Sequence, residues 1–173
     1  MEIRRIAEVE IDTALAGELT TLLRESFADY PARSYFKLPP HFRLVATVDG
    51  AVVGQLGVEL RMMRVGDEVV RTFGVVDVCV RDRGRGIATR LLTEVTDLAR
   101  AREIGFIVLF ADDDRLYTRN GWAREANPLT WVKINDHRTL GLAESEILES
   151  LMVKPLTAQP WPAGEVDLLG PVF

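Results

Sequence analysis

Apolar positions in the first part of the chain change from a weak alternation to a helical repeat and then break. Residues 2–9 alternate and predict an edge strand. From Asp12 onward apolar residues recur every three or four positions and predict a helix that ends before Pro31, with Asp12 or Thr13 as its N-cap. Residues 30–41 predict an irregular connection that is long enough to be functional or mobile. Its aromatic residues either wall a pocket or pack the loop down.

Three strands follow, each marked by alternation or by an apolar run. Turn signals at Asp49-Gly50 and Gly66-Asp67 separate strands at 42–48, 52–62 and 69–80. The second strand is expected to put Val52, Leu56, Val58, Leu60 and Met62 on one face and Gln55, Glu59 and Arg61 on the other. Residues 73–80 are almost continuously apolar, which predicts a central strand that is covered on both faces.

A helix and another buried strand follow the central strand. Residues 87–102 carry one apolar stripe, Gly105 is expected to end that helix, and 106–110 is a short apolar run. Strand, helix and strand in this order predict a parallel pair joined by a right-handed crossover. A ligand is expected at the carboxyl ends of such strands.

The last part of the chain contains shorter elements. Asp113 or Asp114 is expected to cap a short helix that Gly121 ends. Late strands are expected near 129–134, 151–153 and 166–169, with a short helix or turn at 143–150. With 173 residues, and without a linker or an internal repeat, the chain is expected to form one mixed α/β domain over residues 1–173.

The loop Arg83-Gly84-Arg85-Gly86-Ile87-Ala88 lies where the central strand meets the helix. Its glycines let the main chain approach a ligand, the N–H groups of the first helical turn point outward, and the helix dipole favours negative charge. Arg83 and Arg85 add cationic donors. These features fit a phosphate, although an ordinary strand-to-helix turn uses the same residue types.

The same loop resembles the (Gln/Arg)-x-x-Gly-x-(Gly/Ala) signature of the GCN5-related N-acetyltransferase (GNAT) superfamily, which binds the pyrophosphate of acetyl-CoA. Residues 77–80 resemble that superfamily's central strand. Arg115-Leu116-Tyr117 with Gly121-Trp122 resembles its downstream Tyr-x-x-x-Gly-(Phe/Trp) motif. The resemblance implies an α/β (α+β) fold with a mixed, mostly antiparallel central sheet, a splayed parallel strand pair and flanking helices.

The resemblance also implies a cofactor, acetyl-CoA, and the residues that bind it. The pyrophosphate would be held by Arg83, Gly84, Arg85, Gly86, Ile87 and Ala88, and the pantetheine arm would run beside Val78, Cys79 and Val80. By the same resemblance, the Tyr117 hydroxyl points at the coenzyme sulfur and acts as the acid. The alternative is that Tyr117 is a core aromatic residue with a satisfied hydroxyl.

Asp77 is the one acidic residue within the apolar run 73–80. A carboxylate there must be paired, neutralised or exposed to a cleft, and each of these environments shifts its pKa. Asp77 either accepts the proton of an attacking amine, directly or through water, or is a structural aspartate that accepts hydrogen bonds from backbone N–H groups.

Charge and composition limit the classes of binding partner that the sequence predicts. The formal net charge of -5 gives no general attraction to nucleic acid, and no apolar run is long enough to span a membrane. Cys79 is the single cysteine, so neither an intrachain disulfide nor a thiolate metal cluster can form, and no metal is expected. The charged N-terminal residues lack the apolar core of a signal peptide, which predicts a cytoplasmic protein.

Within the superfamily the chain resembles the aminoglycoside 2'-N-acetyltransferases, which offer acidic residues to a polycationic sugar. The matching residues are Asp29, Glu149 and Glu165. We therefore predict an acetyl-CoA-dependent N-acetyltransferase of a small, cationic primary amine that attacks the thioester directly. The alternatives are a longer-chain N-acyltransferase and a non-catalytic module that binds CoA or another metabolite. A late exposed strand could pair two copies into a homodimer.

Overall fold

The computed structural model describes residues 1–145 and 150–173, which form two compact units. Unit 1 comprises Met1–Glu59 and Val75–Val95, and unit 2 comprises the described residues of Leu60–Gly74 and Thr96–Phe173. Strands β3 (Ala51–Val65) and β4 (Glu68–Val80) and helix α2 (Ile87–Ala101) each contribute residues to both units.

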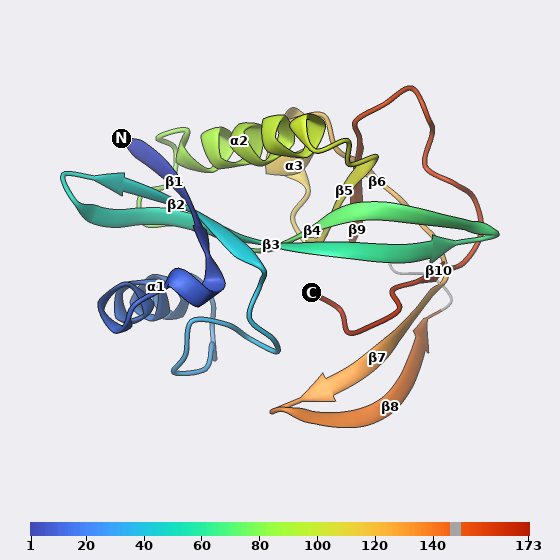
Figure 1. The fold of residues 1–173 in the computed structure, drawn as a ribbon, viewed down its shortest axis with the longest axis horizontal. Coiled ribbons are helices and arrows are strands. Elements are labelled where there is room, and N and C mark those ends of the chain that lie inside the picture. The colour runs from blue at the N-terminus through green and yellow to red at the C-terminus, as the bar shows by residue number, and fades with distance from the viewer. Residues whose placement is uncertain (146–149) are drawn as a thin grey trace. The chain divides into compact units, whose positions relative to one another are not determined.

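Unit 1 is built on antiparallel strands β1 (Glu2–Ala7), β2 (Phe42–Val48) and the first part of β3, with the end of β4 next to β3. A short 3-10 helix, η1 (Glu8–Glu10), leads into α1 (Thr13–Ser26), whose first turn is capped by Asp12, one of the two predicted caps. Helices α1 and α2 lie on opposite faces of these strands (Figure 1). The core under α1 consists of Ile6, Leu19, Leu22, Leu23, Tyr30, Val45, Val52 and Cys79.

Unit 2 has the strand order β6-β9-β5-β4-β3-β10-β7-β8. Its further elements are β5 (Phe106–Phe110), α3 (Arg115–Arg119), β6 (Ala123–Arg124), β7 (Leu129–Asn135), β8 (Arg138–Ser145), β9 (Leu151–Pro155) and β10 (Val166–Asp167). The β4–β5 and β10–β7 pairs are parallel, whereas the β5–β9, β6–β9, β10–β3 and β7–β8 pairs are antiparallel. The predicted fold class, a mostly antiparallel mixed sheet flanked by helices, is therefore confirmed.

Three local predictions were wrong. Residues 138–145 form strand β8 rather than the start of a helix or turn at 143–150, and residues 146–149 lie outside the described part of the chain. Helix α2 ends at Ala101, and the chain leaves it through the left-handed residue Glu103 (φ 55°), after which the Ile104 N–H donates to the Ala99 carbonyl, so Gly105 does not end the helix.

The third error concerns the faces of β3. Gln55 and Glu59 are buried, whereas Leu60 and Met62 are 41% and 49% exposed. The expected alternation fails because polar groups in unit 1 form a buried hydrogen-bonded network, described below, that accommodates Gln55. In unit 2 the buried positions of the same strand are Met63 and Val65 instead.

Two glycines of unit 1 provide a stability test. A Cβ on Gly57 would lie 2.6 Å from Val76 Cγ2 and 3.0 Å from Pro40 Cγ, whereas a Cβ on the exposed helical Gly17 meets nothing within 4 Å. We expect Gly57→Ala to lower the free energy of unfolding by about 1–3 kcal/mol through overpacking. Gly17→Ala should raise it by about 0.5–1 kcal/mol through helix propensity. Denaturant unfolding of both variants tests this, and a Gly57→Ala protein as stable as wild type would contradict the packing.

Candidate active site

The first turn of α2 exposes main-chain donors. The Arg90 N–H donates to the Gly86 carbonyl at 3.0 Å, so Gly86 is the N-cap and the N–H groups of residues 87–89 precede the first intrahelical bond. The loop before the helix, residues 81–86, is exposed throughout. Gly84 and Gly86 are left-handed, with φ of 80° and 72°, and a Cβ on either would meet nothing within 4 Å. An anion can therefore approach these amides.

The start of α2 is fixed to the strands by close packing. Ile87 is buried, and a Cβ on Gly54 of β3 would lie 3.0 Å from Ile87 Cγ2 and 3.0 Å from Val80 Cγ1. The Arg81 N–H donates to the Val53 carbonyl at 2.8 Å. Strand β3 therefore holds both ends of the loop, and the exposed glycines lie between two anchored points.

Positive charge surrounds this loop, although some of it is paired. Arg81 forms an ion pair with Glu25 at 2.9 Å, and Arg85 lies 3.7 Å from Asp82. Both pairs are exposed and contribute little to stability. The arginine side chains are thus able to exchange these partners for a phosphate.

Asp77 has an irregular backbone conformation within strand β4. Its φ of 53° is left-handed, which is uncommon for a residue with a side chain inside a strand. The Tyr30 hydroxyl donates to Asp77 Oδ2 at 2.6 Å. Burial raises the pKa of the Asp77 carboxyl, and the hydrogen bond from Tyr30 and the Arg43 guanidinium offset part of that rise. Burial and Asp77 also raise the pKa of Tyr30 above its usual range, so Tyr30 remains the donor.

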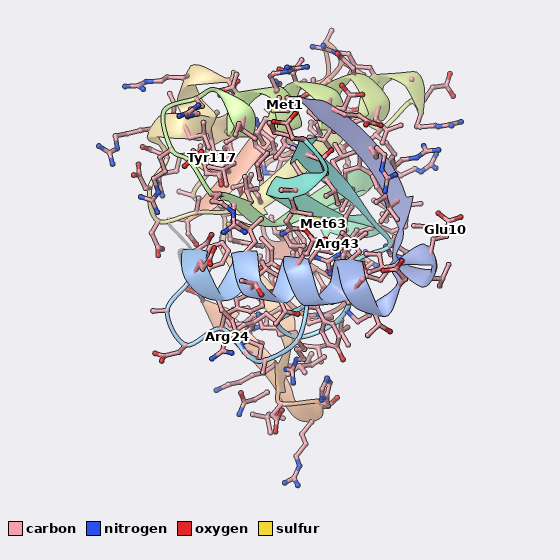
Figure 2. The ribbon with its side chains drawn as sticks, turned by 90° about the vertical axis from the view of Figure 1, so that its left-hand side faces the viewer. Met1, Glu10, Arg24, Arg43, Met63 and Tyr117 are labelled. Carbon is pink, nitrogen blue, oxygen red and sulfur yellow. The ribbon has the colours of Figure 1, made fainter. Side chains whose placement is uncertain are left out.

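A network of polar groups links Asp77 to the interior, and we call it the Arg43 network: Glu8, Arg43, Gln55 and Asp77. Arg43 and Gln55 are buried, whereas Glu8 and Asp77 are partly exposed. Arg43 of β2 is completely buried and lies between α1 and the strands (Figure 2). Its guanidinium donates to Glu8 Oε2 at 2.7 Å and to Gln55 Oε1 at 3.0 Å. The Gln55 amide in turn donates to the Asp77 carbonyl oxygen at 2.6 Å. A charge buried this deeply is costly unless it is paired, and here it is.

Cys79 is buried in the same unit, on the strand that leads to the loop. Burial raises the pKa of its thiol to about 11, although hydrogen bonds from Gln55 and Ser26 offset part of the effect. The thiol is therefore protonated at neutral pH and is not a nucleophile. Val78 and Val80, on either side of it, are half-buried.

Tyr117 belongs to α3 in unit 2. Its carbonyl accepts hydrogen bonds from the N–H groups of Asn120 and Trp122, and the left-handed Gly121 (φ 80°) allows the chain to turn back between them. The Trp122 ring then packs edge-on against the Tyr117 ring with centroids 5.9 Å apart. Burial, together with the charge of Asp113, raises the pKa of the Tyr117 hydroxyl to about 12, so it holds its proton at neutral pH.

The acidic residues proposed for an acceptor lie in different places. Asp29 is exposed in unit 1, directly before Tyr30, with a left-handed φ of 56°. Glu165 is exposed in unit 2 and accepts a hydrogen bond from the Thr130 hydroxyl at 2.5 Å. Glu149 lies outside the described residues.

The described part of the chain has neither a metal-ligand cluster nor a membrane-spanning helix. Residues 1–145 and 150–173 contain no group of three or more His, Cys, Asp or Glu side chains that could hold a metal ion. No helix in those ranges is long and apolar enough to cross a bilayer.

Sequence analysis missed Tyr30, Arg43 and Gln55. It placed Gln55 on a polar strand face and gave the other two no role. A signal was present, because Asp77 and Arg43 each lie within an apolar strand, and a buried carboxylate and a buried guanidinium both require partners. What the sequence lacks is the register that brings these partners together.

The Tyr30–Asp77 hydrogen bond predicts a pH-dependent mutational effect. Removing the hydroxyl in Tyr30→Phe raises the folded-state pKa of Asp77 further and leaves the unfolded value unchanged, so the ionised carboxylate is destabilised in the folded state. We expect the free energy of unfolding to fall by about 2 kcal/mol at pH 7, where a larger fraction of the Asp77 carboxyl is ionised than at pH 4. The loss should be smaller near pH 4, where more of the carboxyl is protonated.

Denaturant unfolding at the two pH values measures this difference. Asp77→Asn provides the matched background, in which Tyr30→Phe should cost the same at both pH values. A cost for Tyr30→Phe that is independent of both pH and Asp77 would contradict the assigned hydrogen bond.

Comparison with known proteins supports an assignment to a family. A family model described as an acetyltransferase (GNAT) domain matches residues 2–124, and the search of curated proteins found no match. The fold is similar to that of GNAT family N-acetyltransferase YhbS from Escherichia coli in complex with CoA, with 20% identity and a TM-score of 0.66 over 96% of this chain and 88% of that chain.

Two further solved structures have the same fold. A GNAT family acetyltransferase from Brucella melitensis in complex with acetyl-CoA is 17% identical, with a TM-score of 0.61 over 95% of this chain and 94% of that one. Aminoglycoside 6'-acetyltransferase type Ii is 19% identical, with a TM-score of 0.61 over 92% of this chain and 100% of that one. At these identities the likeness concerns the fold, and the family model covers more than half of the sequence. The chain therefore belongs to the GNAT acetyltransferase domain family.

Proposed function

We propose that this protein is an acetyl-CoA-dependent N-acetyltransferase that acts on a primary amine of a small, cationic molecule. The observation that carries the proposal is the start of α2. In a chain of the GNAT family, an exposed loop with two left-handed glycines leads into helical amides that precede the first intrahelical bond. Similar solved structures contain CoA or acetyl-CoA, which supports the choice of cofactor.

The residues around the loop fit the pyrophosphate of acetyl-CoA. The main-chain N–H groups of residues 83–88 would donate to it, the dipole of α2 favours its negative charge, and the exposed Arg83 and Arg85 add mobile cations. The half-buried strand residues 78–80 would run beside the pantetheine arm. When bound, acetyl-CoA supplies an acetyl thioester.

Transfer of the acetyl group to an amine needs one proton acceptor and one proton donor. The amine nitrogen forms a bond to the acetyl carbon while the carbon–sulfur bond breaks. Asp77 would take the proton that leaves the nitrogen, and its raised pKa brings it closer to the pKa of such a base at neutral pH. Tyr117, protonated at neutral pH, would give its proton to the departing thiolate.

We propose a cationic acceptor because of the negative charge of the protein. The net charge is -5, and Asp29 and Glu165 are exposed carboxylates that would attract a cation. Glu149 is proposed as a third acceptor-binding carboxylate from the sequence alone, because it lies outside the described residues. Two of the solved structures with a similar fold are aminoglycoside 6'-acetyltransferases, whereas the sequence resemblance is to 2'-enzymes. An acceptor screen by thiol release should therefore include aminoglycosides with free amines at both positions, simple polyamines, and longer acyl-CoA donors.

The loop predicts a specific loss of cofactor binding. Gly86→Ala strains the left-handed residue and adds a Cβ beside the donor amides. We expect the Kd for CoA, measured by calorimetry, to rise at least about fivefold. Gly50→Ala is the matched control because Gly50 is also left-handed (φ 82°), with nothing within 4 Å of its Cβ, but lies in the β2–β3 turn. Equal Kd values for Gly86→Ala and Gly50→Ala would exclude the loop as the binding site.

Tyr117 distinguishes an enzyme from a CoA-binding module. Tyr117→Phe removes the proton donor and keeps the ring that packs on Trp122, so we expect kcat to fall by about 10²–10⁴-fold while the Kd for CoA is unchanged. Stopped-flow detection of free thiol and calorimetry measure the two quantities. If Tyr117→Phe retains the wild-type kcat, Tyr117 is not the acid; if the wild-type protein binds CoA and acetylates no amine, the module is favoured.

A further inference from the structure

Gln55 makes a hydrogen bond that the proposed mechanism does not use. Its side chain is completely buried in β3, and its amide nitrogen donates to the main-chain carbonyl of Asp77 at 2.6 Å and lies 3.7 Å from Cys79 Sγ. Strand β4 thus receives a side-chain donor at the residue where it leaves the regular strand conformation.

The orientation of this amide is determined by its other partner. Arg43 Nη1 donates to Gln55 Oε1 at 3.0 Å, and a guanidinium has donors only, so the amide oxygen must face Arg43 and the amide nitrogen must face β4. Arg43 is itself held by Glu8, which accepts from Nε and Nη2, and by the Ser34 carbonyl, which accepts from Nη2 at 2.7 Å.

Asp77 needs this support because its conformation is unfavourable. A non-glycine residue with φ of 53° inside a strand persists only where its surroundings determine it. Tyr30 holds the carboxylate and Gln55 holds the carbonyl, so the residue is fixed at both its side chain and its main chain. The direction in which residues 78–80 leave Asp77 depends on this conformation.

We propose that Gln55 is a positioning residue: oriented by Arg43, it holds the main chain of Asp77 in the left-handed conformation and so sets the course of residues 78–80 along the cofactor. This inference rests on the proposed function. The pyrophosphate loop does not depend on Gln55 for its donors. Replacing Gln55 should therefore lower kcat and leave CoA binding almost unchanged.

Two substitutions test the proposal. Gln55→Met keeps the volume and removes the hydrogen bonds to Arg43, to the Asp77 carbonyl and to Cys79. Gln55→Glu keeps the bond to Arg43 and puts a carboxylate oxygen against the Asp77 carbonyl. Both should lower kcat by about 10–100-fold, as expected for a small misplacement of reacting groups, and change the Kd for CoA by less than about threefold.

The control is Leu15→Ala, which removes partly buried packing from α1 in the same unit and takes no part in the hydrogen bonds of Gln55. It should lower the melting temperature and leave kcat within about twofold of wild type, measured well below that temperature. Hydrogen–deuterium exchange of peptides covering residues 75–80 is the second readout. Exchange there should rise in Gln55→Met and not in Leu15→Ala.

The measured kcat and hydrogen exchange can each overturn the positioning role of Gln55. A folded Gln55→Met or Gln55→Glu protein with wild-type kcat overturns the proposal, as does a loss of kcat that Leu15→Ala reproduces. If the wild-type protein acetylates no amine, the proposed function fails, and hydrogen exchange alone then decides: unchanged exchange at residues 75–80 in Gln55→Met refutes the positioning role, and raised exchange supports it.

Discussion

The structure of unit 1 depends on how β4 accommodates a left-handed aspartate within a strand. A regular strand pairs along its whole length, but the parallel pairing of β4 with β5 covers Thr72–Gly74, and Asp77 follows three residues later. The conformation at Asp77 is stabilised by the Tyr30 hydroxyl on its carboxylate and by the Gln55 amide on its carbonyl. Burying these groups together with Arg43 is tolerable because each has a hydrogen-bond partner.

The end of β4 leads directly into the start of α2, so the two local features are linked by sequence. Packing of Ile87 and Val80 against Gly54 anchors the loop, and the left-handed glycines expose the first helical amides between those anchors. Electrostatic preorganisation of this kind requires donors that are not already satisfied by the protein. Rigid anchors and open amides are therefore complementary requirements of one binding site.

Most of the elements were predictable because their signals are local. The position of the glycine loop before α2, the apolar stripe of α2 and a cap at Asp12 or Thr13 each depend on neighbouring residues, and the structure has the loop, the stripe and an Asp12 cap. The Arg43 network was not predictable, since its members come from η1, β2, β3 and β4 and meet only through strand register. The same network explains why Gln55 is buried although alternation places it on a polar face.

Binding of the CoA pyrophosphate by the first turn of α2 is the interaction on which the proposed activity depends. Two-dimensional ¹⁵N NMR of the labelled protein, titrated with CoA and separately with pantetheine, tests it most directly, because pantetheine lacks the phosphates. We expect CoA to shift the amide resonances of residues 84–89 strongly downfield and pantetheine to leave them almost unchanged. Equal shifts with both compounds, or CoA binding that leaves residues 84–89 unaffected, would contradict it.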